Sequence, residues 1–293
     1  MKTPALIRLL RPSQWLKNTF VFMPLVFSRH LFQWEYTVQA VTAFVAFCFA
    51  SSCVYIINDI IDKEADKLHP TKKYRPIPAG EISTTPASIT ALILLGLTIF
   101  FSFKLAMLYT GMILFYIGMQ ILYSFILKNI VIVDVFVIAM GFMIRVLGGA
   151  VAIDVTISHW IVITTLFLSL FLAVSKRRSE IVMIQQYNIQ TKRLVLEQYS
   201  IQFLDYILVI TATGMAISYS LYTMAERTIA VFGTEYLIFT TIFVLFGIFR
   251  YLFLVLIKGQ GENPTEILLK DIPMGLNMFF WMITVVFIIY FSK

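Results

Sequence analysis

The chain has 293 residues, of which 59% are hydrophobic and 13% are charged, and its formal net charge at pH 7 is +7. So small a charged fraction leaves little room for a soluble domain and indicates an integral membrane protein. The net positive charge suits the inside loops of a membrane protein and a phosphate-binding site, so it gives no argument for a nucleic-acid partner.

Apolar segments of spanning or near-spanning length follow one another along the chain, and we count about nine of them. They cover residues 16–28, 36–57, 89–103, 105–126, 130–152, 160–175, 203–224, 237–257 and 275–291. Because a backbone in lipid must satisfy its polar groups internally, each segment is expected to be a helix. The sequence therefore predicts an all-α membrane protein with a single integral domain over residues 1–293.

Basic residues set the expected orientation of these helices. Residues 1–17 form a basic, amphipathic lead-in that we expect to lie along the cytoplasmic interface, with Trp15 at the level of the headgroups. With the N-terminus inside, most lysines and arginines outside the apolar segments fall in cytoplasmic loops, as the positive-inside rule favours. These loops are predicted at residues 59–88, 176–202 and 258–273.

An acidic motif opens the first of these loops, with Asn58, Asp59, Asp62 and Asp66 at spacings of one, three and four. On a helix, Asn58, Asp62 and Asp66 would line one face. Like charges at that spacing repel one another, and a divalent cation would remove the repulsion. Magnesium takes oxygen ligands and is commonly shared between carboxylates and substrate phosphates. We predict that these four residues bind Mg²⁺ and that Asn58, Asp62 and Asp66 are catalytic.

A basic run follows the acidic motif and ends at a proline. The run from Lys72 to Arg75 is expected to bind the phosphate oxygens that the metal leaves over, with Lys73 and Arg75 as substrate-binding residues. The alternative is a solvated, charge-rich loop between two membrane helices. A solvated loop rarely places carboxylates on one face beside a proline-bounded basic run, so we favour the binding site.

Ionisable residues also occur inside the apolar segments. Asp134 and Arg145 lie in one segment, and their spacing leaves them about 20° apart in direction on a helix. Either residue facing lipid would cost roughly 2.5–3.5 kcal/mol at the centre of the membrane. Both are therefore expected to face a polar interior, where they bind substrate or fix helix packing through a polar neighbour. Tyr123 and Lys128 precede this segment at the cytoplasmic surface, where Lys128 could also be an ordinary interfacial lysine.

A second charged group follows the segment at 160–175. Lys176, Arg177 and Glu180 have spacings of three and four, which would also suit a plain surface salt bridge. The group ends a long apolar helix on the side of the membrane where the acidic motif is predicted. This placement favours a binding role.

The motif Asn58-Asp59-x-x-Asp62-x-x-x-Asp66 resembles the first aspartate-rich motif of the UbiA superfamily of intramembrane prenyltransferases. The resemblance implies a bundle of nine transmembrane helices, here in a bacterial plasma membrane with the active site facing the cytoplasm. Usual members carry a second motif, Asp-x-x-x-Asp, after the sixth helix. This chain has Lys176-Arg177-Arg178-Ser179-Glu180 at that place, which speaks against ordinary prenyl transfer.

The chain resembles instead the polyprenyl-phosphate phosphoribosyltransferase branch of that superfamily. This resemblance rests on the Lys176 to Glu180 stretch and on residues 11–18, 69–76, 123–128 and 141–149. This resemblance implies Mg²⁺-dependent transfer of a 5-phosphoribosyl group from phosphoribosyl diphosphate (PRPP) to a polyprenyl phosphate, with release of pyrophosphate. The implied substrate-binding residues are Lys17, Lys73, Arg75, Tyr123, Lys128, Asp134, Arg145, Lys176, Arg177 and Glu180. Among them, Lys17 and Lys128 would bind the phosphate of the lipid acceptor.

Three other functions compete with this interpretation. A prenyltransferase that moves a prenyl group from a prenyl diphosphate to an aromatic acceptor would share the first acidic motif. A transporter or channel would use Asp134 and Arg145 to line a path, but would leave the acidic motif without a role. A scaffold protein would need no row of carboxylates at all.

Overall fold

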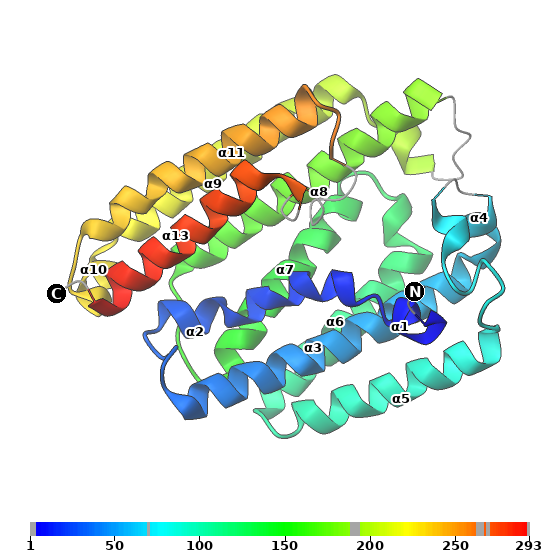
Figure 1. Ribbon diagram of the computed structural model, residues 1–293, viewed down its shortest axis with the longest axis horizontal. Coiled ribbons are helices and arrows are strands. Elements are labelled where there is room, and N and C mark those ends of the chain that lie inside the picture. Colours follow the sequence, from blue (N-terminus) through cyan, green and yellow to red (C-terminus); the bar gives the residue numbers. More distant parts are fainter. Residues whose placement is uncertain (1–3, 69–70, 188–193, 262–266, 268–269, 292–293) are drawn as a thin grey trace. The chain divides into compact units, whose positions relative to one another are not determined.

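The computed structural model describes residues 4–68, 71–187, 194–261, 267 and 270–291. Over this part of the chain the protein consists of helices and contains no strand, so the predicted all-α class is confirmed (Figure 1). Eight helices among the described residues are long and apolar enough to cross a membrane. They are α3 (Trp34–Ile61), α5 (Thr84–Ser102), α6 (Met107–Phe125), α7 (Val133–Ala152), α8 (His159–Tyr187), α9 (Ile201–Met224), α11 (Thr241–Leu256, preceded by η5, Tyr236–Thr240) and α13 (Ile272–Phe291).

The predicted segment at 16–28 differs from the other eight. It forms part of the 3-10 helix η1 (Pro12–Phe22) and the short helix α2 (Met23–Phe27). Pro24 near the start of α2 lacks a backbone N–H and so cannot donate a backbone hydrogen bond. Among the described residues the structure therefore has eight helices of spanning length where nine segments were predicted, and the segment at 16–28 forms two shorter helical pieces.

The chain is made of two compact units. Unit 1 comprises residues 1–25, 33–128 and 144–155, and unit 2 comprises residues 26–32, 129–143 and 156–293. The boundary between 143 and 144 falls within α7, so this helix contributes its first part to unit 2 and its second part to unit 1.

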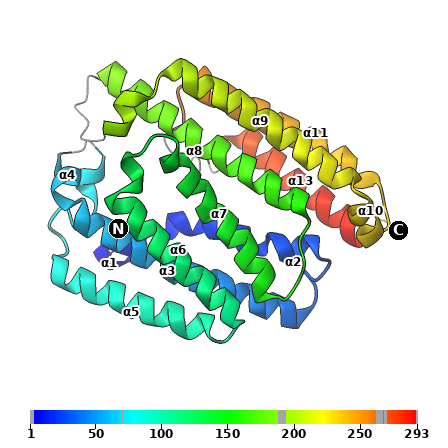
Figure 2. The same ribbon diagram turned by 180° about the vertical axis from the view of Figure 1, so that it is seen from behind.

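In unit 1, α3 packs against α5 and α6, and Figures 1 and 2 both show α5 alongside α3. The short helix α1 (Ala5–Leu10) packs on α3 through Leu9, which is fully buried, while Leu6 and Ile7 are exposed. Apolar side chains of α3 and α6, such as Phe47 and Tyr109, form the core of this unit. A second cluster, which includes Leu9, Ile56 and Ile77, packs around the last turns of α3, where the acidic motif lies.

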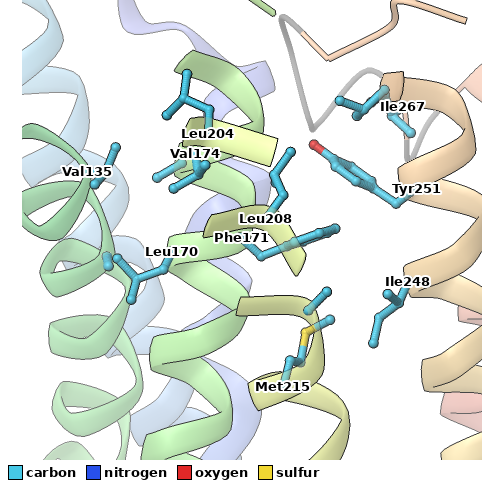
Figure 3. Close-up of a cluster of buried hydrophobic side chains, with 14 of the residues drawn as sticks. Val135, Leu170, Phe171, Val174, Leu204, Leu208, Met215, Ile248, Tyr251 and Ile267 are labelled. Atoms are coloured by element: carbon cyan, nitrogen blue, oxygen red, sulfur yellow. The ribbon is translucent and has the colours of Figure 1, made fainter. Parts of the chain in front are cut away.

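In unit 2, α8 packs along α9, and α11 packs against α9 and α13. Figure 2 shows α9 and α11 side by side. Figure 3 shows the core between α8, α9 and α11, where the rings of Phe171 and Tyr251 lie 5.1 Å apart next to Leu208 and Met215. The helix α10 (Glu226–Phe232) and the 3-10 helix η4 (Leu194–Gln198) complete the described part of this unit.

Two predicted loops are partly helical. Helix α8 continues beyond Ser175 to Tyr187, so Lys176 to Glu180 lie on a helix instead of in a loop. The loop predicted at 59–88 contains the end of α3, the helix α4 (Lys63–Lys67), the 3-10 helix η2 (Lys72–Tyr74) and the start of α5. Hydropathy marks only where apolar sequence stops, and a helix with charged partners can extend further. Parts of the loops predicted at 59–88, 176–202 and 258–273 lie outside the described residues.

Candidate functional site

The acidic motif lies where α3 ends and α4 begins. Asn58 and Asp59 occupy the last turn of α3, Asp66 is in α4, and Asp62 lies between the two helices with φ −88° and ψ 7°. Backbone hydrogen bonds still join Asp62 N to Asn58 O at 2.9 Å and Asp66 N to Asp62 O at 2.8 Å. The prediction of one continuous helical face is wrong at Asp62, where the helix is interrupted. The i to i+4 hydrogen-bond connection through the motif is nevertheless kept.

Two of the acids are buried and share an arginine. Asp59 is 1% exposed and Asp66 is 4% exposed. Arg75 Nη1 donates to Asp59 Oδ1 at 3.1 Å and to Asp66 Oδ2 at 2.6 Å, and Arg11 donates a further hydrogen bond to Asp59 Oδ1. A buried carboxylate is tolerated only when its charge is compensated. The two arginines therefore explain how Asp59 and Asp66 remain buried in unit 1.

The other two predicted metal ligands contact residues at and after the end of α6. Lys128 Nζ donates to Asp62 Oδ1 at 2.9 Å, and Ser124 donates to Asn58 Oδ1. Tyr123 is half-buried and directly precedes Ser124. The structure thus brings Lys128 into contact with the acidic motif, and it adds Ser124, which was not among the predicted site residues.

The oxygen atoms of this motif suit a divalent cation. Asp59 Oδ2 is buried and has no hydrogen-bond partner among the described residues. Such an atom is costly unless a ligand supplies the missing interaction. Over the same part of the chain, no group of three or more His, Cys, Asp and Glu side chains could hold a metal ion by itself. A cation at this motif would therefore have to complete its coordination with substrate phosphates and water, which is the usual arrangement for magnesium.

The basic run contributes unevenly to this cluster. Lys72 Nζ lies 3.9 Å from Asp66 Oδ1, whereas Lys73 is exposed, with its Nζ 5.1 Å from the centre of the Tyr74 ring. Lys72, the first residue of the predicted basic run, is thus the lysine of this run that the structure pairs with an acid. The phosphate-binding role of Lys73 stays a prediction.

Arg145 belongs to a separate polar group in unit 1. Its Nε donates to Asn18 Oδ1 at 2.8 Å, and its Nη2 donates to Tyr116 Oη at 2.9 Å. The guanidinium also lies over the rings of Tyr116 and Phe47, at 4.8 Å and 5.6 Å from their centres. Arg145 is 5% exposed, so the prediction that it avoids lipid is confirmed. These contacts match the alternative that Arg145 fixes helix packing through polar neighbours.

Lys17 lies in η1, outside the eight long apolar helices. Its Nζ donates to Gln14 Oε1 at 2.7 Å. Burial, and then the positive charges of Arg145 and Arg11, lower the pKa of Lys17 to about 8. Lys17 therefore keeps its proton at neutral pH in surroundings of like charge, which would favour the approach of an anion.

Unit 2 contains a buried ion pair between α7 and α8. Arg177 Nε donates to Asp134 Oδ2 at 2.5 Å, and the two side chains are 1% and 0% exposed. Arg177 Nη1 also donates to Glu180, while the Tyr199 hydroxyl donates to Asp134 Oδ1 at 2.7 Å. Both oxygens of Asp134 are therefore paired. A phosphate that binds Arg177 would have to compete with two carboxylates.

Asp134 and Arg145 share α7 but belong to different units and have different partners. Lys176 precedes Arg177 on α8 and is half-buried. Sequence reasoning missed Arg11, Ser124 and Tyr199 as members of these clusters. Arg11 and Ser124 lie in the stretches 11–18 and 123–128 that carry the resemblance, but nothing there indicated their partners, because the contacting residues are distant in sequence.

Comparison with known proteins agrees with these features. Residues 19–283 match the profile of the UbiA prenyltransferase family. The chain is 32% identical to the decaprenyl-phosphate phosphoribosyltransferase of Mycolicibacterium smegmatis, over 98% of this chain and 93% of that protein. It is also 32% identical to the protein of the same name from Corynebacterium glutamicum, over 97% of this chain and 86% of that protein.

Solved structures resemble the fold at lower identity. A UbiA homologue from Archaeoglobus fulgidus bound to GPP and Mg²⁺ has a TM-score of 0.73 and 18% identity, covering 98% of this chain and 99% of that chain. A digeranylgeranylglyceryl phosphate synthase has a TM-score of 0.63 and 17% identity, covering 96% of each chain. The acidic motif lies at the end of a long apolar helix, and the all-helical fold is shared with these structures. The family profile matches most of the chain, which therefore belongs to the UbiA prenyltransferase family.

Proposed function

We propose that the chain transfers a 5-phosphoribosyl group from PRPP to a polyprenyl phosphate lipid and releases pyrophosphate. The observation that carries the proposal is the mixture of acids and cations at the end of α3, where Asp59 and Asp66 meet Arg75 and Arg11. Such a mixture suits a donor that brings both a metal and several phosphates. The names of relatives that are 32% identical over nearly the whole chain support this choice of donor and acceptor.

The donor diphosphate would bind at the acidic motif. Mg²⁺ would be held there by the donor together with Asn58, Asp59, Asp62 and Asp66, and would stabilise the negative charge on the leaving pyrophosphate. Arg75 would bind the donor's remaining phosphate oxygens, aided by Lys72 and by the predicted Lys73. Arg75 and Lys72 would exchange their carboxylate partners for phosphates when the donor arrives.

The transfer itself needs little proton chemistry. The bond between the ribose C1 and the diphosphate oxygen breaks, and pyrophosphate leaves with the electron pair. An oxygen of the lipid phosphate supplies the electron pair for the new bond to C1 from the opposite face. Because a phosphate monoester is already anionic at neutral pH, no strong general base is required. Lys17 and Lys128 are proposed to hold the phosphate of the acceptor.

In unit 2, Asp134 is proposed to orient Arg177 through the ion pair that the structure shows. Lys176, Arg177 and Glu180 keep their predicted roles with phosphate and ribose, and Tyr123 and Arg145 keep theirs in substrate binding. We place the enzyme in a bacterial plasma membrane with its N-terminus and the acidic motif on the cytoplasmic side, as the distribution of basic residues favours. The orientation can be tested with Lys67→Cys and a thiol reagent that does not cross the membrane, because the native Cys48 and Cys53 are buried and should not react. Labelling of Lys67→Cys from the outside of intact cells would refute the proposed orientation.

The test uses purified protein in detergent with Mg²⁺, radiolabelled PRPP and a polyprenyl phosphate, followed by organic extraction. Label is expected in the lipid phase, and EDTA or Asp62→Asn should reduce it at least about 100-fold. Glu64→Gln is the matched control, because Glu64 lies in the same stretch but is exposed and pairs with Lys67 at 2.8 Å. Full activity of Asp62→Asn would refute the metal site. Transfer only from a prenyl diphosphate to an aromatic acceptor would refute the proposed reaction.

A further inference from the structure

Arg11 reaches the acidic motif from an unusual backbone conformation. It lies between α1 and η1 with φ 53° and ψ 58°, in the left-handed region that residues with a Cβ rarely adopt. Its guanidinium lies 5.0 Å from the centre of the Tyr55 ring and donates to Asp59. Because such a conformation persists only where surrounding contacts hold it, these contacts are part of what keeps Arg11 in place.

The charge of Arg11 adds to compensation that already exists. Arg75 neutralises Asp59 and Asp66, and Arg11 brings a second cation to the same oxygen of Asp59. The Arg11 side chain is 19% exposed and the Asp59 side chain only 1%, so solvent screens this interaction weakly. A second cation on Asp59 reduces the attraction that this carboxylate can offer to a divalent metal.

We propose that Arg11 competes with Mg²⁺ for Asp59, so that the metal binds tightly only together with phosphates that give Arg11 another anion to pair with. The coupling to PRPP rests on the proposed function, whereas the competition needs only Asp59, Arg11 and a divalent cation. In this scheme the site stays neutralised until metal and diphosphate arrive together. Because coupling between two ligands is reciprocal, removal of Arg11 should strengthen binding of the metal alone and weaken its dependence on the diphosphate.

The experiment measures Mn²⁺ binding by electron paramagnetic resonance to the full chain in detergent without donor. Arg11→Gly keeps the left-handed backbone accessible, because glycine adopts positive φ without strain. We expect Arg11→Gly to bind Mn²⁺ about tenfold more tightly than the wild type. Arg8→Gln, from the same N-terminal stretch but paired with Glu81, should bind like the wild type. Equal, weaker or undetectable Mn²⁺ binding by the folded Arg11 variant overturns the proposal.

Two further arms separate the competition from folding defects and from the proposed reaction. Arg11→Gln is measured alongside, with thermal unfolding of both variants, so that the result does not depend on one of them folding. Inorganic pyrophosphate should raise the Mn²⁺ affinity of the wild type by a larger factor than that of Arg11→Gly, and equal factors overturn the proposal. If pyrophosphate has this effect and PRPP has none, the competition stands and the proposed donor is wrong.

Discussion

Breaking the buried ion pair of unit 2 should destabilise the protein more than replacing both of its partners. Asp134 is 0% exposed and Arg177 is 1% exposed, so neither charge can be hydrated when the other is lost. Removing one partner of a buried pair costs about 3–5 kcal/mol. Asp134→Leu also leaves the Tyr199 hydroxyl without this acceptor, at about 1 kcal/mol, while Glu180 still compensates Arg177. We expect a net loss of about 3–4 kcal/mol for Asp134→Leu.

A double-mutant cycle with Arg177→Met isolates the pair. When both charges are replaced by apolar side chains, no uncompensated charge remains at the pair itself, so the double variant should recover about 2 kcal/mol relative to the sum of the single variants. The free energy of unfolding can be followed by tryptophan fluorescence during titration of mixed micelles with a denaturing detergent. Single costs that add without coupling, or an Asp134→Leu cost below about 1 kcal/mol, would refute the reasoning.

Two further perturbations test unit 1. A Cβ on Gly149 would lie 2.2 Å from the backbone oxygen of Val21, so Gly149→Ala should lower the free energy of unfolding by about 1–3 kcal/mol. Gly96→Ala is the control, because its Cβ would meet no described atom within 4 Å, and it should not lower the melting temperature. Equal melting temperatures of the two variants would contradict the packing of Gly149 against Val21. Lys17 loses its proton above its pKa of about 8, so the KM for polyprenyl phosphate should rise above that pH, and Lys17→Arg should abolish the rise. Because the unfolded chain holds this proton up to about pH 10.5, the Lys17 contribution to the free energy of unfolding should increase from pH 8 to 10.5. A wild-type KM for polyprenyl phosphate that does not change with pH would argue against the role of Lys17 in binding the acceptor phosphate.

The membrane helices were predictable because a span needs about 20 apolar residues, and few other constraints decide its position. The ends were less predictable, and α8 is the clearest case. Lys176 and Arg177 interrupt the hydropathy pattern, yet the helix continues to Tyr187 because acids such as Asp134 and Asp205 pair with its arginines. A single-sequence reading has no access to those partners.

The acidic motif was predictable from its spacing, but its internal geometry was not. Spacing alone places Asn58, Asp62 and Asp66 on one face, whereas in the structure Asp66 pairs with Arg75 and Asp59 is buried with Arg11 and Arg75. The partners of Asp59 come from positions 48 residues before it and 16 residues after it. Such contacts are set by how helices pack, and local periodicity carries no information about them.

The charged group on α8 changes what unit 2 can do with a metal. By resemblance, usual members carry two aspartates where this chain has Lys176 to Glu180. Here Arg177 pairs with Glu180 and with Asp134, so a metal would have to displace an arginine that is 1% exposed and leave it uncompensated. Metal dependence should therefore come from the acidic motif of unit 1.

Glu180→Gln and Asp66→Asn test this division of roles. Glu180→Gln should leave the Mg²⁺ concentration for half-maximal activity within about twofold of the wild-type value, whatever happens to the maximal rate, because Glu180 compensates an arginine. Asp66→Asn should raise that concentration at least about tenfold, because Asp66 is proposed to bind the metal directly. The measurement is a Mg²⁺ titration of phosphoribosyl transfer at saturating PRPP. If Glu180→Gln raised the Mg²⁺ requirement as much as Asp66→Asn, then Glu180 would have to contact the metal, and the ion pair with Arg177 would give way when the donor binds.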